Sequence, residues 1–334
     1  MKSNEVIQKL EIELANLNSS THGRRTFLAA LPFLLASCAT SKKHRYREGS
    51  NKGQKTSITV KDEKKMAKEY LPKMLKDYPP YQDKYLQGYI NHVGQNIVQT
   101  NKLHQKPYQY RFRLVESQTI NAFALPAGEI FVTGPLLLMA ESEAELAGVI
   151  GHEIGHVKAR HSAERIDAAK KEEGKSALYG LGGALLGGIA GYGLGKAVCG
   201  KKDKECVERI AKYGAGAGAI GGLLIQKYAF MANSREDELE ADRIGFRTSV
   251  QAGYHKDYVG RFYNKLYLME KQAKKSQSKV IASLSDAMST HPPGKDRVAQ
   301  MKVMAKKQKL FGPSKITTDH FAKAQTTLKK IMKV

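Results

Sequence analysis

The segment His152-Glu153-Ile154-Gly155-His156 carries two histidines four residues apart, with a glutamate beside the first. On a helix, positions i and i+4 lie on one face, so His152 and His156 can direct two imidazole nitrogens at one metal ion. Glu153 would then face a water molecule that zinc activates, and would accept its proton as the water attacks a peptide carbonyl. The pattern predicts a zinc-dependent hydrolase with Glu153 as its base.

A catalytic zinc ion takes a third protein ligand. One class of zinc peptidase uses a histidine six residues after the second one, but Ser162 stands at that position here. His161, one position earlier, is interpreted as a helix-surface residue. The remaining source is a carboxylate from a second helix, and the acidic stretch 234–242 supplies several. Its candidate ligands are Glu236, Glu238 and Glu240. Spacing alone does not choose among them.

The elements around these residues predict a mainly α fold with a small mixed β-sheet, an α+β arrangement. Helical periodicity is expected over 63–105, 141–166, 231–252 and 259–287. Alternating apolar residues and turn signals predict three short strands, at 108–115, 121–126 and 129–133. The long helix 141–166 would carry both histidines, and the helix 231–252 would carry the third ligand.

A glycine-rich stretch, 176–226, separates the two helices. Its glycines recur every four residues and would form a smooth stripe on each arm of a helical hairpin. The stretch 176–195 is uncharged and long enough to cross a bilayer, whereas the second arm is short. A soluble or membrane-grazing hairpin is favoured over a membrane-inserted one. Cys199 and Cys206 would form a disulfide that closes its loop, as expected in an oxidising compartment.

The N-terminus resembles an export signal. Arg24 and Arg25 precede an uncharged run that is too short to span a bilayer and ends in Leu-Ala-Ser before Cys38. This order predicts a lipoprotein signal peptide of twin-arginine type over 1–37, with lipid attached to Cys38. The alternatives are a plain secretory signal with an accidental cysteine, or a buried helix. Because Ala39 follows instead of aspartate, the expected location is the outer membrane, facing the periplasm.

The rest of the chain is divided by composition. Residues 38–62 form a basic tether, 63–310 the metallopeptidase domain with its insert, and 311–334 a Lys-rich tail. The net charge of +23 would favour anionic partners. Export would take the protein away from nucleic acid, and its basic residues are scattered along the chain. The membrane surface is therefore the expected anionic partner, and nucleic acid is not expected as a partner.

Three separated motifs, HEIGHVKARH, SREDELEADRIG and STHPP, resemble in this order the zinc metallopeptidase family of CAAX prenyl endopeptidases and HtpX, above all its periplasmic BepA and LoiP branch. The resemblance covers about 70–297. It implies a gluzincin-type domain that binds one zinc ion per chain, with Glu238 as the third ligand. It also implies that Asp242 orients a ligating histidine.

The resemblance assigns roles to further residues. His291 would either stabilise the developing oxyanion or cover zinc in a resting state; the alternative is a loop histidine before two prolines. Arg297 would assist near the site. An edge strand would pair with an extended substrate through main-chain hydrogen bonds, and its residues are Asn121, Ala122, Phe123 and Ala124. Its alternative is an ordinary structural strand.

These features predict a lipid-anchored zinc endopeptidase of the bacterial envelope that degrades misfolded or stalled proteins. The substrate class comes from the family resemblance. A second hypothesis is an envelope assembly factor or chaperone with a latent zinc site. A third is a membrane-inserting protein in which the glycine-rich hairpin is the functional element.

Overall fold

A computed structural model describes residues 48–51, 53–105, 107–168, 233–273, 291, 294–309 and 312–333. All of them belong to one compact unit, Tyr46–Val334. The predicted signal peptide, Cys38 and the glycine-rich stretch with Cys199 and Cys206 lie outside the described residues. In the part of the chain that is described, no helix is long and apolar enough to span a membrane.

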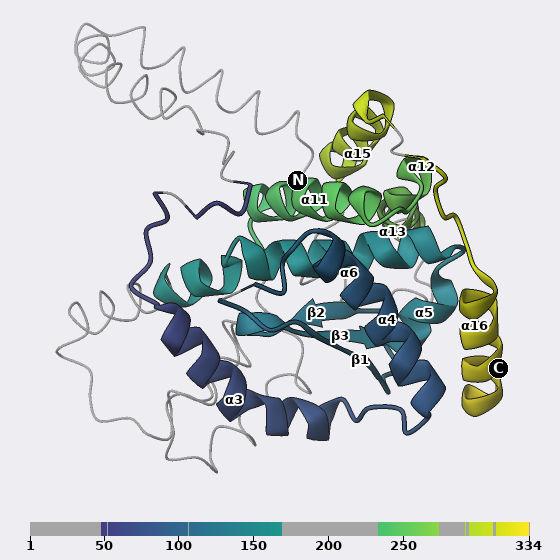
Figure 1. The fold of residues 1–334 in the computed structure, drawn as a ribbon, viewed down its shortest axis with the longest axis horizontal. Coiled ribbons are helices and arrows are strands. Elements are labelled where there is room, and N and C mark those ends of the chain that lie inside the picture. Colours follow the sequence, from purple (N-terminus) through teal and green to yellow (C-terminus); the bar gives the residue numbers. More distant parts are fainter. Residues whose placement is uncertain are drawn as a thin grey trace, which may run out of the picture. The chain divides into compact units, whose positions relative to one another are not determined.

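Helices make up most of the described structure (Figure 1). They are α3 (Val60–Asp77), α4 (Lys84–Thr100), α5 (Gly134–Met139), α6 (Glu143–Lys158), α11 (Arg235–Gln251), α12 (Lys256–Val259), α13 (Arg261–Ala273), α15 (Lys295–Lys307) and α16 (Asp319–Met332). The two helices with the motif residues begin at serine caps. Ser142 accepts from the backbone N–H of Glu145, and Ser234 forms a capping box with Asp237.

The sheet has three strands, β1 (Arg111–Val115), β2 (Ala122–Ala124) and β3 (Glu129–Thr133), in the order β1-β3-β2. β1 runs parallel to β3, whereas β2 is antiparallel to it. The predicted mainly α fold with a small mixed sheet is therefore confirmed. β2 lies at one edge of this sheet, as expected.

Each face of the sheet is covered by helices (Figure 1). Side chains on one face join a large core with α4 and α6, among them Phe112, Leu114 and Ile130. Side chains on the other face meet α3, and Phe123 stacks on Phe131 with ring centroids 4.9 Å apart. This alternation follows from the two-residue period of a strand. The sheet thus supports α6 from one side.

The predicted long helix 141–166 is wrong in one respect, because it is interrupted. α6 ends at Lys158, Arg160 has a left-handed backbone (φ 57°), and helical structure resumes over 161–168. The carbonyls at the end of α6 are satisfied by side chains from near the N-terminus. Asn51 Nδ2 donates to the carbonyl of Lys158 (3.1 Å), and Gln54 Nε2 donates to that of Ala159 (2.9 Å).

Two segments that composition sets apart from the catalytic domain pack against it. The described residues of 49–58, here called the N-terminal strap, bind the end of α6 and the segment 161–168. Residues 311–334 include α16, which buries Phe321 and Leu328 in the main core. The lysine-rich composition of these segments did not predict this packing. The lysines whose side chains are described, such as Lys55, Lys323 and Lys329, are exposed.

Candidate metal centre

The two motif helices, α6 and α11, cross at unusually short range because glycines lie at their contact. A Cβ atom on Gly155 would lie 2.7 Å from the carbonyl oxygen of Ala241. A Cβ on Gly245 would lie 2.5 Å from the backbone nitrogen of His152. Real Cβ atoms do not approach backbone atoms this closely, so the crossing requires glycine at both positions. It brings the histidine face of α6 against the acidic face of α11.

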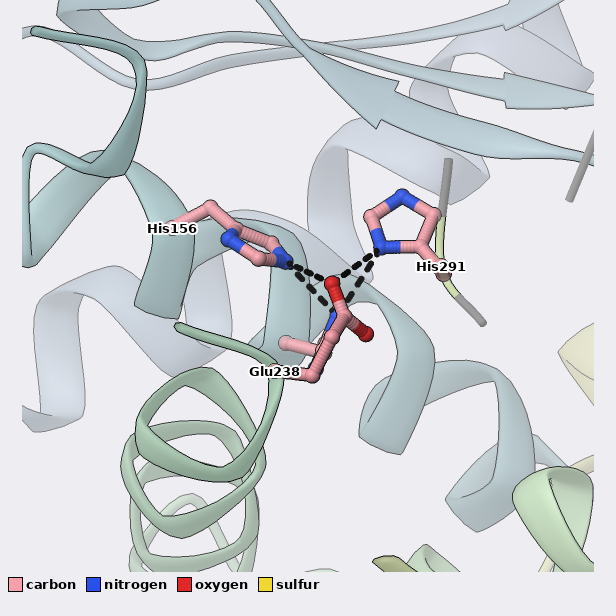
Figure 2. Close-up of side chains that lie close together, drawn as sticks. His156, Glu238 and His291 are labelled. Atoms are coloured by element: carbon pink, nitrogen blue, oxygen red, sulfur yellow. Dashed lines mark hydrogen bonds and ion pairs between the residues drawn. The ribbon is translucent and has the colours of Figure 1, made fainter. Parts of the chain in front are cut away.

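Four side chains converge at this crossing: His152, His156, Glu238 and His291. One ligand atom from each lies within 4.8 Å of all the others. The Nε2 atoms of His152 and His156 are 2.8 Å apart, and they lie 3.4 and 3.3 Å from the oxygens of Glu238. Figure 2 shows His156 and His291 converging on the Glu238 carboxylate.

The spacing of these atoms fits a single metal ion. Ligand atoms around a tetrahedral zinc with bonds of about 2.0–2.1 Å are separated by about 3.4 Å. The two imidazole nitrogens and the carboxylate oxygens of Glu238 lie 2.8–3.4 Å from one another, which is close to that arrangement. Two histidines with one glutamate also form a ligand set typical of catalytic zinc. Among the acidic candidates on α11, Glu238 is the one that joins this group.

Asp242 and Arg297 surround the ligands. Asp242 Oδ1 lies 2.8 Å from Nδ1 of His152, where it can accept the ring proton and leave Nε2 for a metal. The Arg297 guanidinium donates to both oxygens of Asp242 at 2.7 Å and lies 2.5 Å from Glu238 Oε2. All of these side chains are buried. Arg297 therefore links the third ligand to the residue that orients the first.

Charge in the centre is set by these contacts. Burial alone would raise the pKa of Glu238 and of Asp242, but Arg297 and the neighbouring histidines together outweigh burial and hold both pKa values below their usual range. Burial also opposes the protonated form of His152, yet Glu238 and Asp242 raise its pKa to about 9. A cation that binds here would displace the proton from His152. Glu238 and Asp242 are therefore ionised, and their negative charge favours the binding of a metal cation beside Arg297.

Glu153 projects into the same centre and is 2% exposed. Its Oε1 lies 3.4 Å from Nε2 of His291. Burial raises the pKa of Glu153, and the positive charges of His291 and His152 oppose this shift only in part. A glutamate whose pKa lies above the usual value is suited to accept a proton and to return it.

Comparison with known proteins identifies the family. The sequence pattern of peptidase family M48 matches residues 84–305, which contain all the side chains of the centre. The chain belongs to this family. The match confirms the resemblance drawn from the three motifs.

Relatives of this M48 chain include beta-barrel assembly-enhancing proteases. The one from Escherichia coli is 24% identical over 272 residues, which cover 81% of this chain and 49% of the relative. That from Yersinia pestis is 26% identical over 254 residues, covering 76% and 46%. The mitochondrial metalloendopeptidase OMA1 of Arabidopsis thaliana is 30% identical over 204 residues, covering 60% and 33%. The chain spans about half the length of the beta-barrel assembly-enhancing proteases.

One expectation about this M48 centre is wrong. His161 is not a helix-surface residue, because it is fully buried and its Nδ1 lies 2.8 Å from Nδ1 of His156. An uninterrupted helix would place residues 156 and 161 on different faces. The break at Arg160 turns His161 back toward His156. The motif spacing carried no signal for this contact.

The remaining predicted site residues fall in two places. His291 lies at the centre, with its Nδ1 3.2 Å from His152 Nε2 and 3.1 Å from Glu238 Oε1. The predicted edge-strand residues form β2 and the residue before it; β2 pairs with β3 and also contacts α6. Of these, Asn121, Ala122 and Phe123 are buried, while Ala124 is half-buried. Sequence reasoning did not single out Asn233, whose Nδ2 lies 3.4 Å from His156 Nε2.

Proposed function

We propose that the chain is a zinc-dependent endopeptidase in which His152, His156 and Glu238 hold one zinc ion and Glu153 is the general base. The observation that carries this proposal is the convergence of three ligand atoms on one point beside a buried glutamate, on a chain of family M48. When bound, zinc would lower the pKa of a coordinated water toward neutrality and polarise the carbonyl of the scissile peptide.

The protein's own residues then move the protons. Glu153 takes a proton from the attacking water, a step that its raised pKa favours, and then passes that proton to the amine that leaves. Asp242 keeps the proton of His152 on Nδ1, which directs Nε2 at the zinc. Arg297 makes the largest contribution to keeping Asp242 and Glu238 ionised against the effect of burial.

For His291 we infer the role of a fourth ligand that covers zinc in a resting state. Its Nδ1 faces the same point as the three proposed ligands, at 3.2 Å from His152 and 3.1 Å from Glu238. A catalytic site keeps one coordination position open for water or substrate. His291 would therefore have to leave before hydrolysis, and its departure would also free Glu153 from the contact with its Nε2.

Substrates are proposed to bind as an added strand along β2. This strand pairs with β3 on one side and lies at the sheet edge on the other. Phe123 anchors it through stacking on Phe131, which leaves the main chain to pair with an extended peptide. Recognition through the backbone would accept many sequences, as suits a protease for unfolded chains.

The proposed substrates are unfolded or misassembled proteins of the bacterial envelope. Two observations support this: the order of the N-terminal export features up to Cys38, and the similarity to proteases named for beta-barrel assembly. The second candidate, an assembly factor or chaperone with a latent zinc site, is favoured by the closed position of His291. Cleavage of unfolded protein by the zinc-loaded chain would exclude this alternative.

Two glutamates on α11 test the proposed ligand set. Glu238→Gln should strip zinc from the purified protein, because it removes a charged ligand from the centre. Glu236→Gln is the matched control, since Glu236 lies on the same turn outside the ligand group and should leave the zinc content unchanged. Elemental analysis of both variants decides the matter. Full zinc occupancy in Glu238→Gln would refute the assignment.

Membrane attachment is tested at the predicted lipidation site. Cys38→Ala should release the protein from the membrane fraction into the soluble extract, since no lipid can then be attached. The comparison is with the wild type expressed in the same cells. Continued tight membrane binding of the variant would indicate that another element, such as the glycine-rich stretch, holds the protein there.

A further inference from the structure

His156 directs its Nε2 at the proposed zinc position, so its other nitrogen, Nδ1, must carry the ring proton. That nitrogen lies 2.8 Å from Nδ1 of His161. A hydrogen bond between two imidazole nitrogens needs one donor and one acceptor. His161 must therefore accept at Nδ1, and in its neutral form it holds its own proton on Nε2.

The other nitrogen of His161 faces buried carboxylates. Nε2 lies 3.4 Å from Glu240 Oε2 and 3.7 Å from Asp237 Oδ1. Both His161 and Glu240 are fully buried. An ionised carboxylate can only accept hydrogen bonds, so it stabilises the tautomer with the proton on Nε2, which is the one that His156 requires.

The second oxygen of Glu240 is bound from outside the two motif helices. Its Oε1 accepts a hydrogen bond from the backbone N–H of Gly49, at 3.2 Å. Gly49 has a left-handed backbone (φ 71°), and a Cβ atom there would lie 2.8 Å from the Lys158 side chain. Glycine is therefore needed to bring this N–H to Glu240. A continuous set of hydrogen bonds runs from the N-terminal strap through Glu240 and His161 to His156.

We propose that His161 and Glu240 are positioning residues for the metal ligand His156, and that the N-terminal strap completes their alignment through Gly49. The inference rests on the proposed zinc site. It gives His156 the support that Asp242 gives His152, with an imidazole inserted between ligand and carboxylate.

The test is the zinc affinity of the full chain, measured by competition with a chromophoric chelator. His161→Phe keeps a ring but removes both nitrogens. Its zinc affinity is expected to fall roughly 10–100-fold, the range typical when an outer partner of a metal ligand is lost. His161→Gln supplies an acceptor and a donor again, so its affinity should recover toward that of the wild type.

Asp167→Asn is the matched control. Asp167 lies on the same helical segment, is buried and accepts from the backbone N–H of Ser57 in the strap, at 3.1 Å. Ser57 lies at the other end of the strap from Gly49, so the substitution weakens this contact but removes none of the hydrogen bonds that lead from Gly49 to His156. Its zinc affinity should stay at the wild-type level even where its thermal stability drops, which separates positioning from general stability.

Glu240→Gln is a second variant in case His161→Phe does not fold. A glutamine replaces one carboxylate oxygen with an NH2 group, so a donor would face either the N–H of Gly49 or the Nε2–H of His161. Its zinc affinity should also fall. Wild-type affinity in a folded His161→Phe or Glu240→Gln protein would overturn the inference alone. Failure of the wild type to bind zinc would instead refute the proposed function.

Discussion

Glu238 and Asp242 are two buried carboxylates that share one guanidinium, that of Arg297. Each would cost several kcal/mol to bury as an isolated ion, and the cation between them offsets this cost. The same contact keeps Glu238 ionised, which a metal ligand must be. At the scale of the residue, stability and metal binding therefore depend on the same side chain.

Arg297→Met should be strongly destabilising, because it leaves two buried carboxylates without their cation. The expected loss is about 3–5 kcal/mol of unfolding free energy, measured by urea denaturation. Arg235→Met is the control. Arg235 pairs with Asp296 at an exposed site, where an ion pair contributes about 0–1 kcal/mol. Equal losses in the two variants would contradict the role given to Arg297.

Helix α6 is the element on which the centre depends, and it is almost wholly buried. Its ligand face is held against α11 by contacts that only glycine allows, at Gly155 and Gly245. Its C-terminal carbonyls are bound by the N-terminal strap. The element is thus fixed from its side and from its end, as a precise ligand geometry requires.

Gly245→Ala should separate α6 from α11. Its new methyl group would meet the backbone of His152, so we expect a loss of about 1–3 kcal/mol and weaker zinc binding. Gly88→Ala on α4 is the control, since nothing lies within 4 Å of its Cβ position. Alanine there should stabilise the helix by about 0.5–1 kcal/mol. Thermal unfolding and zinc titration of both variants test the expectation.

A pH effect is expected where α3 meets the end of α6. Burial raises the pKa of Glu63, although Tyr108 and Arg160 oppose the shift. The folded state therefore binds the Glu63 proton more tightly than the unfolded state does. The stability from Glu63 is full below its unfolded pKa, about 4.5, and is lost as pH rises through the folded value.

Urea unfolding of the wild type and of Glu63→Gln across this range measures the effect. The wild type should lose stability relative to the variant as pH rises from about 4.5, the ordinary pKa of a glutamate side chain. The sign is decisive here. A relative gain in wild-type stability with rising pH would mean that Arg160 dominates over burial at this site.

At the scale of the whole molecule, the N-terminal strap and α16 extend the catalytic unit in both directions along the sequence. The strap reaches the end of α6, and α16 buries Phe321, Ala324 and Leu328 in the same core as α4 and α6. Both segments lie beyond residues 84–305, the part that matches the family pattern. The stable unit is therefore larger than that part.

Leu328→Ala tests the contribution of α16. Leu328 is fully buried, so its truncation should cost about 2–5 kcal/mol. Leu268→Ala is the matched control, because Leu268 is 48% exposed and its loss should change stability by no more than about 0.5 kcal/mol. Denaturant midpoints of the two variants provide the comparison. Equal denaturant midpoints would mean that α16 contributes little to the stability of the core.

Local patterns in the sequence predicted the parts of the centre that depend on local spacing. The i, i+4 histidines and the adjacent glutamate need only a helix, and alternation in β1 together with turn signals around β2 and β3 was enough to predict the three strands. Glu238 was chosen by family resemblance, since helix spacing fits its neighbours as well. His161 and the strap were missed because their contacts depend on a backbone break at Arg160 and on residues 107 and 191 positions apart in the chain.

Zinc content together with cleavage of unfolded casein, measured for the wild type and Glu153→Gln, tests the central claim most directly. The account predicts that both proteins bind one zinc ion per chain and that only the wild type cleaves at a measurable rate. Loss of a general base typically lowers the rate by about 10²–10⁴-fold. Cleavage by zinc-loaded Glu153→Gln at the wild-type rate would contradict the account.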